Sequence, residues 1–502
     1  MMENYAVWTA EESRAHDKRA QELNIELSWL MENAGARAAY YLLPELSGPG
    51  LILVGKGHNG GDALVAARHL ARHLDVSIVM PLGRPSFALG ESLLQAAVSY
   101  GAKVVDSVTN LSSYHWVVDG VFGTGFHGSV TNQDFNRLWH LLSQNKIPLY
   151  ALDILSGIDA DSGAYNLESV QAAKTLTFGA AKWGHFGYPG SRFGGQLVVL
   201  DIGLPDMRAL SGYWLNPLWA RQRVSGRDFY THKYRRGTVA VVGGSESMPG
   251  APVLAALAAL KTGAGLVELF VPETILNRIQ APTPLLVRGI KVHSGWEFSS
   301  EDRERLRRAD IIVVGPGLGP HVHPPLLRDI SSLNKPLVVD ADALRLLTED
   351  TAVVLPSGSV LTPHAGEMGR LLGMSSQEVD EFRYRAVRQA VSHFKVSVIL
   401  KGPFSLTGAK GVFVNTVNTP SLATAGSGDV LSGIVAALLA KSPPNESGEE
   451  AAFATYLHGW AGIWAERDQG LSVVATDIIA ALGKAWDSVR EGEIPPSLPI
   501  SL

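Results

Sequence analysis

The stretch that decides the fold reads Ala423-Thr424-Ala425-Gly426-Ser427-Gly428-Asp429-Val430-Leu431-Ser432-Gly433. Its small residues at Gly426–Gly428 lead into an acid, and the apolar run from Val430 to Ala440 predicts a buried helix. A glycine-rich turn at a helix N-terminus exposes backbone N–H groups, to which the helix dipole adds partial positive charge. The stretch therefore predicts a phosphate-binding turn.

Asp429 follows this turn at a place where a carboxylate would repel a phosphate. One interpretation is a helix N-cap, because Asp favours that position. The other is a catalytic base that takes a proton from a hydroxyl group attacking phosphorus. The stretch by itself leaves both interpretations open.

Length and composition bound the class of protein. With 502 residues the chain is too long for one ordinary core, so we expect two domains. The net charge of -5 argues against a nucleic-acid partner, and the absence of cysteine excludes disulfides, thiolate metal sites and a cysteine nucleophile. Met1–Arg14 lacks the pattern of a signal peptide, and the apolar runs are too short to span a membrane. We expect a cytoplasmic protein without a membrane partner.

The first half begins with a helical pattern from Ala10 to Leu43, which the polar groups of Met31–Gly35 are expected to interrupt. A strand at Leu51–Val54 leads into the loop Gly55–Ala63, and a helix is expected from about Asp62 to Leu74. The loop contains G-x-G-x-x-G between a strand and a helix, which is the pattern of dinucleotide-binding sites.

Two details of this region argue against a dehydrogenase. The next strand, Val76–Met80, ends in Pro81–Arg84 without an acid to hold a ribose. Asp62, at the start of the expected helix, would face a pyrophosphate directly. Asn59 and Asp62 are better suited to gripping polar groups or a cation.

Asp119 and Asp153 each end a hydrophobic strand of the first half. Because ligands bind at the carboxyl ends of the strands in open α/β sheets, we expect these acids in one crevice with Asn59 and Ser156. Oxygen ligands without sulfur or a paired histidine suit a hard cation such as potassium or magnesium. For either acid alone, the alternative is an ordinary acid that starts a turn.

The two domains are expected at 1–215 and 225–502, with a boundary between positions 206 and 227, where no strong period appears. Trp214 and Trp219 fall in this stretch and indicate that the linker packs down.

The second half repeats short β-branched strands that end in glycines, acids, one histidine and one lysine. A lysine and a helix N-terminus near a phosphate are standard parts of phosphoryl-transfer sites. His364 alone would be structural and Lys401 alone would be solvated, but the ordered series favours a nucleotide site. The strand ends are Gly243-Gly244-Ser245, Gly315–Gly319, Asp340–Leu344, Thr362–Glu367, Lys401–Ser405 and Gly426–Asp429. Both halves thus read as α/β folds with parallel strands.

The first half resembles the NAD(P)HX epimerase domain, the YjeF N-terminal family. Its motifs are Met31–Gly35, Gly55–Asp62, Asp119–Phe126 and Asp153–Gly163. The resemblance implies a Rossmann-like αβα fold. It also implies a potassium ion held by Asn59, Asp119 and Ser156, and a hydrated nicotinamide nucleotide bound by His58, Asn59, Gly60, Gly61, Asp62, Gly123, Thr124, Gly125, Phe126, His127, Gly128, Ser129 and Asp153.

This half departs from the family pattern at three positions. His58 stands where the family usually has Asn, Ala63 where it has Gly, and Leu155 where it has Pro. His58 is the departure that bears on epimerase rate or substrate fit. Lys182 matches a family lysine, and a solvated lysine is the alternative.

The second half resembles the ribokinase-like superfamily, and more closely the ADP-dependent NAD(P)HX dehydratase, the YjeF C-terminal family. The match follows the strand ends from Gly315–Gly319 to Gly426–Asp429 in order. The resemblance implies a second three-layer αβα fold. It places the adenine nucleotide on Lys401, Gly402, Pro403, Phe404, Ser405, Gly426, Ser427 and Gly428, and the hydrated substrate on Ala251, Gly317, His364 and Asp429.

Together the two resemblances imply repair of the hydrated cofactors NADHX and NADPHX. The first domain would interconvert the R and S hydrates, with Asp153 as the candidate base. In the second, Asp429 would deprotonate the ring hydroxyl, which would attack the terminal phosphoryl of ADP. Phosphate would then leave the ring, and AMP would be the other product, with magnesium as cofactor. We also expect a homo-oligomer.

The alternative is a small-molecule kinase in the second domain that stops at the phosphorylated product. The first domain would then be a non-catalytic nucleotide-binding module.

Overall fold

The computed structural model describes residues 5–205, 211–224, 233–279, 284–293, 295–496 and 499–501. The chain forms two compact units, one of Met1–Tyr213 with Leu498–Leu502 and one of Trp214–Ser497. Much of the expected boundary, at 206–210 and 225–232, lies outside the described residues. Trp214 and Trp219 are described and buried, as the sequence predicts for a linker that packs down.

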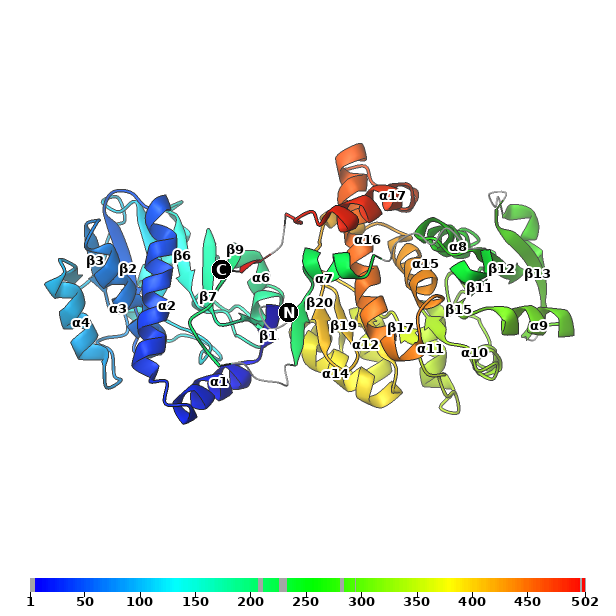
Figure 1. Ribbon diagram of the computed structural model, residues 1–502, viewed down its shortest axis with the longest axis horizontal. Coiled ribbons are helices and arrows are strands. Elements are labelled where there is room, and N and C mark those ends of the chain that lie inside the picture. The colour runs from blue at the N-terminus through cyan, green and yellow to red at the C-terminus, as the bar shows by residue number, and fades with distance from the viewer. Residues whose placement is uncertain are drawn as a thin grey trace. The chain divides into compact units, whose positions relative to one another are not determined.

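The first unit is built on a sheet with the strand order β21-β9-β7-β6-β5-β2-β3-β4, in which neighbouring strands run parallel (Figure 1). Its strands are β2 (Gly50–Val54), β3 (Val76–Val79), β4 (Lys103–Val105), β5 (Trp116–Gly120), β6 (Leu149–Leu152), β7 (Lys174–Phe178), β9 (Gln196–Leu200) and β21 (Ile500–Ser501). Because the strands are parallel, the loops after β2, β5 and β6 emerge at one edge of the sheet.

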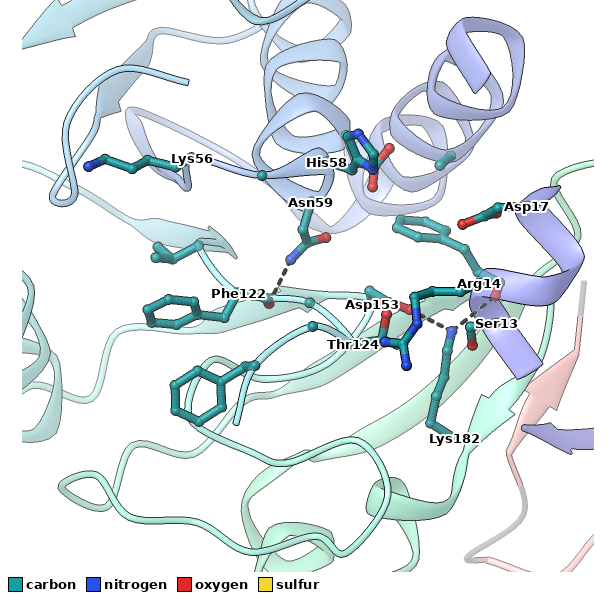
Figure 2. Close-up of a pocket in the computed structure, with 18 of the residues that line it drawn as sticks. Ser13, Arg14, Asp17, Lys56, His58, Asn59, Phe122, Thr124, Asp153 and Lys182 are labelled. Atoms are coloured by element: carbon teal, nitrogen blue, oxygen red, sulfur yellow. Dashed lines mark hydrogen bonds and ion pairs between the residues drawn. The ribbon is translucent and has the colours of Figure 1, made fainter. Parts of the chain in front are cut away.

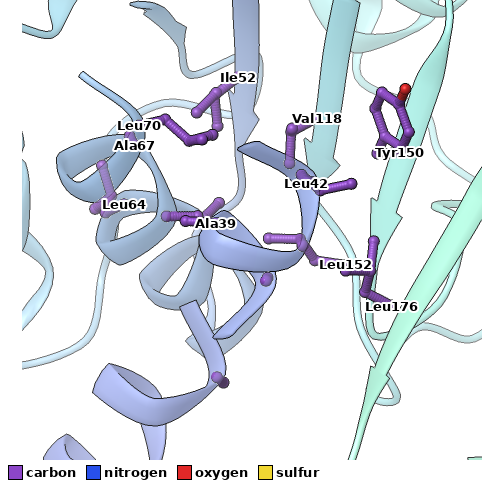
Figure 3. Packing of buried hydrophobic residues seen from close by; sticks show 14 of the residues in the cluster. Ala39, Leu42, Ile52, Leu64, Ala67, Leu70, Val118, Tyr150, Leu152 and Leu176 are labelled. Atoms are coloured by element: carbon purple, nitrogen blue, oxygen red, sulfur yellow. The ribbon is translucent and has the colours of Figure 1, made fainter. Parts of the chain in front are cut away.

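Helices cover both faces of this sheet. They are α1 (Ala10–Glu22), α2 (Leu27–Leu42), α3 (His58–Leu70), α4 (Gly90–Ser99), α5 (Gln133–Ser143) and α6 (Gly190–Phe193). Ile52 and Val54 of β2 pack with α2 and α3 in the cluster that Figure 3 shows. Leu51 and Leu53, which alternate with them, pack with α5 on the opposite face. The unit therefore has the expected three-layer αβα arrangement.

The expected single helix from Ala10 to Leu43 is wrong, because the structure has two helices there. The chain breaks after α1, where Asn24 adopts a left-handed conformation (φ 59). Met31–Gly35 does not interrupt a helix but lies inside α2. Its residues divide between two environments: Met31 and Gly35 are buried, whereas Glu32 pairs with Arg68 on α3.

The helix after β2 begins earlier than expected, at His58 instead of Asp62, and it ends at Leu70. Its early start follows from close packing. A Cβ on Gly60 would lie 2.0 Å from the carbonyl oxygen of Gly55, and one on Gly35 would lie 2.5 Å from that of Asp62. The glycines thus let α3 sit directly on the sheet end and on α2.

Three short strands outside this sheet, paired through β1, bring the N-terminal helix to the sheet edge. β1 (Ala6–Trp8) pairs in parallel with β8 (Ala181–Lys182), with Trp8 opposite Lys182. β1 also pairs antiparallel with β10 (Gly212–Trp214). Since α1 follows β1 directly, this pairing places α1 beside Lys182.

The second unit has a parallel sheet in the order β13-β12-β11-β15-β16-β17-β18, with β14 antiparallel to β13 and a β18-β19-β20 meander (Figure 1). Its strands are β11 (Thr238–Val242), β12 (Leu266–Pro272), β13 (Leu286–Val292), β14 (Trp296–Glu297), β15 (Ile311–Val314), β16 (Leu337–Val339), β17 (Val360–Leu361), β18 (Ser397–Leu400), β19 (Leu406–Gly408) and β20 (Val412–Val414). The strands expected before the glycine and acid turns are all present.

Helices again cover both faces, with α8, α15 and α16 on one and α11, α12 and α14 on the other (Figure 1). The helices are α7 (Pro217–Gln222), α8 (Ala251–Thr262), α9 (Ser300–Arg308), α10 (Pro325–Ser331), α11 (Asp342–Glu349), α12 (Ala365–Leu372), α13 (Ser376–Glu381), α14 (Arg383–Phe394), α15 (Ser427–Leu439), α16 (Ser447–Gln469) and α17 (Ala475–Glu491). The second αβα unit is thus also as expected.

The predicted buried helix after the phosphate-binding turn is confirmed. It is α15, which packs against α8 and α16 and against β11, β15 and β16. In the described part of the chain, every helix falls short of the length and apolar character needed to cross a membrane.

Candidate functional sites

The first unit holds a cavity of ≈ 720 Å³ at the sheet edge formed by the loops after β2, β5 and β6 (Figure 2). α1 and α2 close it from the other side. The predicted residues that line it are His58, Asn59, Asp62, Gly123, Thr124, Gly125, Phe126, His127, Ser129 and Asp153. The structure therefore brings most of the predicted epimerase set to one space.

Gly60, Gly61 and Gly128, which belong to the same predicted set, do not line the cavity. Gly60 and Gly61 instead permit close packing, since a Cβ on Gly61 would lie 2.5 Å from the sulfur of Met31. Gly128 adopts a left-handed conformation (φ +84) that shapes its loop.

Asp153 and Lys182 form a buried ion pair in this cavity. The Lys182 ammonium donates to Asp153 Oδ1 at 2.6 Å, to Thr177 Oγ1 at 2.8 Å and to the Phe178 carbonyl at 3.1 Å. Lys182 is only 2% exposed, so the alternative of a solvated lysine is wrong. Burial raises the pKa of Asp153, but the Lys182 charge and the bonds from Lys182 and Thr177 outweigh it and leave the pKa below its ordinary value.

The backbone of Asp153 is held in an uncommon left-handed conformation (φ 62). Its N–H donates to the Leu176 carbonyl at 2.7 Å, and its carbonyl accepts from His185 Nε2 at 3.0 Å. Burial and then the Lys182 charge lower the pKa of His185 to about 4, so this imidazole is neutral and acts as a fixed support.

Two further carboxyl groups face the same cavity, and their pKa values are raised instead of lowered. Burial raises the pKa of Asp62 well above its ordinary value, and the charges of Asp153 and Asp17 add to the rise. Burial also raises the pKa of Asp17, with Lys182 opposing and Asp153 adding. The carboxyl groups of Asp62 and Asp17 therefore hold a proton more readily than an ordinary aspartate, whereas that of Asp153 holds it less readily.

Sequence reasoning missed the contribution of α1, and within the predicted loop Gly55–Ala63 it gave Lys56 no role. Ser13, Arg14 and Asp17 project from α1 into the cavity, and Lys56 lies at its far side (Figure 2). No local pattern marks the residues of α1. Only the spacing of Ser13 and Asp17, one helical turn apart, places them on one helix face.

Asn59, Asp119 and Ser156 come together beneath the cavity. Ser156 donates through Oγ to Asp119 Oδ1 at 2.7 Å and through its N–H to Oδ2 at 2.8 Å. Asn59 Nδ2 donates to the carbonyls of Phe122 and Leu152, which fixes its amide orientation. Its Oδ1 is buried and has no hydrogen-bond partner among the described residues.

The departures from the family pattern fall in different environments. Ala63 and Leu155 are fully buried and do not line the cavity. His58 does line it, and its ring meets Phe87 edge-on at 5.6 Å. His127, which also lines the cavity, pairs with Asp159 at 2.7 Å.

The second site forms around the N-terminus of α15. The N-cap is Gly426 in a left-handed conformation (φ 85), and Asp429 is the third residue of the helix. The N-cap interpretation of Asp429 is therefore wrong. A Cβ on Gly428 would lie 3.4 Å from Lys401 Nζ, so the ammonium group stands directly beside the glycine turn.

Lys401 is fixed by carboxylates from two neighbouring strand ends. Its Nζ lies 2.8 Å from Asp340 Oδ1 and 3.8 Å from Glu367 Oε2. Ser432 of α15 donates to the second oxygen of Asp340 at 2.6 Å. The alternative of a solvated lysine does not hold, because its side chain is only 20% exposed.

Asp429 is not paired in the same way. Burial raises its pKa to about 7, the Asp340 charge adds to the rise, and Lys401 opposes it. A carboxyl group that titrates near neutral pH is suited to general-base catalysis.

His364 has a structural role that the sequence left as an alternative. It is the N-cap of α12, and its Nδ1 accepts from the backbone N–H groups of Gly366 at 3.0 Å and Glu367 at 3.4 Å. The backbone thus engages Nδ1, and Nε2 lies 3.5 Å from Glu367 Oε1.

The remaining predicted residues lie at neighbouring strand ends. A Cβ on Gly317 would lie 3.0 Å from that of Ala251, and one on Gly426 would lie 2.6 Å from Leu254, on the first turn of α8. Ser427 Oγ lies 3.2 Å from buried His458. In the turn of Gly402, Pro403, Phe404 and Ser405, the Ser405 hydroxyl donates to the Gly402 carbonyl at 3.0 Å.

Arg383 supports this turn from below and was not found from the sequence. It is 8% exposed and donates to the carbonyls of Leu400 and Lys401 at 3.3 and 3.4 Å. Its guanidinium would lie 3.0 Å from a Cβ on Gly402. The sequence gives no signal for Arg383, because α14 also contains Arg385 and Arg388.

Each of the two units matches a known protein family. Residues 28–184 match the family described as YjeF-related protein N-terminus, and residues 239–484 match NAD(P)H-hydrate dehydratase. The bifunctional NAD(P)H-hydrate repair enzyme of Moorella thermoacetica is 34% identical over 97% of this chain and 97% of its own. That of Pyrobaculum aerophilum is 33% identical over 96% of this chain and 99% of its own.

Among solved structures, a ribokinase-like superfamily protein from Enterococcus faecalis is similar with a TM-score of 0.50. It is 23% identical and covers 57% of this chain and 99% of its own. This likeness supports the ribokinase-like fold of the second unit.

Proposed function

The chain belongs to the family of bifunctional NAD(P)H-hydrate repair enzymes, and from this premise we propose how its two units divide the work. The protein epimerises the R and S hydrates of NAD(P)H and dehydrates the S hydrate. We assign the epimerase to 1–215 and the dehydratase to 225–502. A kinase reading of the second unit is not favoured, because the relatives match both units together.

The observation that carries the dehydratase assignment is the pair of Asp429 and Lys401 at the start of α15. Asp429, with its pKa near 7, would take the proton of the ring hydroxyl. Lys401 and the N–H groups at Gly426–Gly428 would hold the phosphate groups of the nucleotide while that hydroxyl attacks the terminal phosphoryl. Phosphorylation turns a poor leaving group into a good one, and loss of phosphate restores the ring double bond.

We propose ADP as the co-substrate and magnesium as the metal of this unit. No three His, Cys, Asp or Glu side chains of the described residues converge as metal ligands. Magnesium in a nucleotide site does not need such a cluster, because phosphate oxygens and one or two carboxylates bind it there. Magnesium would neutralise charge on the transferred phosphoryl group.

In the first unit, we infer that the hydroxyl group gains a proton and leaves the hydrated ring carbon as water, and that water adds to the other face and gives up a proton. We propose that Asp153, kept ionised by Lys182, is the base for this step. The predicted residues that line the cavity would hold the dinucleotide around it.

Potassium fits the donors beneath this cavity. The unpartnered Asn59 Oδ1 is a free ligand, and Asp119 is fully buried without a cationic partner in any ion pair of the described residues. Burial raises the pKa of Asp119 to about 6 against the hydrogen bonds from Ser156 and Val121. A cation there would offset the cost of burying the Asp119 charge. With Ser156 Oγ, these oxygens suit a hard cation.

Potassium should therefore stabilise the first unit. At ten times the Kd, we expect a gain of about 1.4 kcal/mol, which raises Tm by roughly 3–6 °C compared with tetramethylammonium. Thermal unfolding in matched chloride salts measures this. In Asn59→Ala the difference between the salts should vanish, whereas equal Tm values in the original chain would contradict the potassium site.

The pH dependence of dehydration should follow Asp429. Because only the ionised carboxylate accepts a proton, kcat/KM should rise with pH and level off above about 7. Phosphate release measured from pH 5 to 9 tests this. A rate that stays constant between pH 5 and 8 would rule out Asp429 as the base.

The whole assignment is tested by incubating the protein with mixed R and S NADHX, ADP and magnesium while following absorbance of the reduced nicotinamide. Recovery of both epimers, faster than they interconvert spontaneously, is expected. Recovery of the S fraction alone would remove the epimerase assignment, and His58 would be the first residue to examine. No recovery with ADP or ATP would remove the dehydratase assignment.

We also propose a cytoplasmic location and a homo-oligomer. Cell fractionation and sedimentation analysis test these two proposals. Substituting ATP for ADP in the assay above tests the choice of nucleotide.

A further inference from the structure

The cavity of the first unit has two chemically different ends in Figure 2. Asp153 and Lys182 lie together at one end, and Lys56 lies on the opposite side of the view. If the nicotinamide ring reacts at Asp153, the elongated dinucleotide has to extend across the cavity. Lys56 then stands at the adenosine end.

The position of Lys56 in the fold points to the adenosine ribose. It belongs to the turn between β2 and α3, and β3 lies beside β2 in parallel register, with Leu51 opposite Ser77. In dinucleotide-binding sheets, the residues after the second strand select the cofactor. An acid binds the ribose 2′-hydroxyl, whereas a cation accommodates a 2′-phosphate.

The loop after β3 corresponds to the case in which a cation accommodates a 2′-phosphate. Met80–Arg84 contains no acid. The Arg84 guanidinium donates to both oxygens of Glu91 at 2.9 Å, so its charge is already balanced. Of Arg84 and Lys56, the cations beside this loop, Lys56 is therefore the one whose charge is not balanced by such a pair.

The Lys56 side chain reaches over this loop. Its Cε would lie 3.5 Å and its Nζ 4.0 Å from a Cβ on Gly83. The Ser86 N–H donates to the Lys56 carbonyl at 3.1 Å, which ties the loop to the turn. Within the described part of the chain, no hydrogen bond or ion pair engages the Lys56 ammonium, which leaves it available to an anion.

We propose that Lys56 binds the 2′-phosphate of the hydrated dinucleotide, so that the epimerase unit prefers NADPHX to NADHX. This inference rests on the proposed epimerase function. It adds a specificity-determining residue outside the residues that the family resemblance assigns. The absence of an acid after β3 removes the contact that would favour NADHX.

The test uses the full chain without nucleotide, so that the dehydratase is idle, and separates R and S epimers by chromatography. The unmodified chain should show the higher kcat/KM with R-NADPHX. Lys56→Met should lower kcat/KM for NADPHX about tenfold through KM and leave NADHX unchanged, as expected for loss of one charged contact. Lys56→Arg should retain the preference.

Lys103→Met is the matched control. Lys103 is an exposed lysine of the same sheet that pairs with Asp75 at 2.7 Å and does not line the cavity, so neither substrate should be affected. An equal loss for both substrates in Lys56→Met would place Lys56 on the diphosphate and overturn the proposal. Unchanged kinetics for both would show a solvated lysine and also overturn it. Failure of the unmodified chain to epimerise either hydrate would instead remove the epimerase function itself, and this inference with it.

Discussion

Asp429→Asn should stop dehydration and leave epimerisation intact. The amide cannot accept the ring hydroxyl proton, so we expect kcat to fall about 10²–10⁴-fold, the usual contribution of a general base. The measurement is phosphate release from S-NADHX and ADP, with chromatography of R and S hydrates as the readout of the first unit.

The matched control is Asp477→Asn. Asp477 occupies the same third helical position in α17, but it caps that helix by accepting the Val474 N–H at 2.9 Å. Its loss should affect stability without a comparable loss of kcat. If both variants retain kcat, or if both lose it equally, Asp429 is not the base.

The free energy of unfolding of Asp429→Asn should also show that Asp429 does not stabilise the fold at neutral pH. Because the folded pKa of about 7 lies above the ordinary 3.8, the folded state holds the proton more tightly, and the contribution of Asp429 to stability falls as pH rises through that window. Compared with the original chain, the Asn variant should therefore gain stability above pH 7. Denaturant unfolding at pH 5 and pH 8 measures the change, and a loss at pH 8 would contradict it.

Lys182→Met should destabilise the first unit and abolish epimerisation. It leaves Asp153, which is 13% exposed, without its charged partner, and a broken buried pair costs about 3–5 kcal/mol. Chemical unfolding followed by a signal from the first unit gives the change in the free energy of unfolding. The double variant Asp153→Asn/Lys182→Met should recover most of the stability but none of the activity, because it removes the uncompensated charge along with the base.

Lys174→Met provides the comparison for this variant. Lys174 pairs with Glu45, but the two side chains are 19% and 37% exposed, so the loss should be about 0–1 kcal/mol. If Lys182→Met costs no more than Lys174→Met, the Asp153–Lys182 pair does not hold the cavity together. If the double variant stays as unstable as the single one, an unpaired Asp153 is not the cause.

The sequence predicts the strands of this protein well because their signals are local. Leu51–Val54, Ile311–Val314 and Val360–Leu361 are β-branched or aliphatic runs closed by turn residues, and each forms a buried parallel strand. The predicted start of α3 was wrong because it depends on packing. Gly60 packs on Gly55 and Gly35 on α3, and these contacts cannot be read from helix periodicity. The break after α1 was missed although its signal is local, since the Ile25 N–H donates to the Ala20 carbonyl around left-handed Asn24.

The candidate site residues also fall into those that the sequence predicts and those that only the structure reveals. Acids that end neighbouring parallel strands meet at one edge by topology, and so Asp119 and Ser156 are in direct contact and Asn59 lies beside them. Asp17 and Arg14 could not be found because α1 reaches the cavity through the pairing of β1 with β8, which joins residues far apart in the chain.

By itself, then, the sequence determined the two αβα units, the order of their strand-end loops and the glycine turn before α15. These follow from short patterns of residues whose geometry is set by the backbone. Only the tertiary structure decided that Asp429 is not an N-cap, that Lys182 is paired with Asp153, and that the Lys56 ammonium has no partner among the described residues. Burial and the charges of distant residues set these properties, and both depend on side chains that the fold brings together.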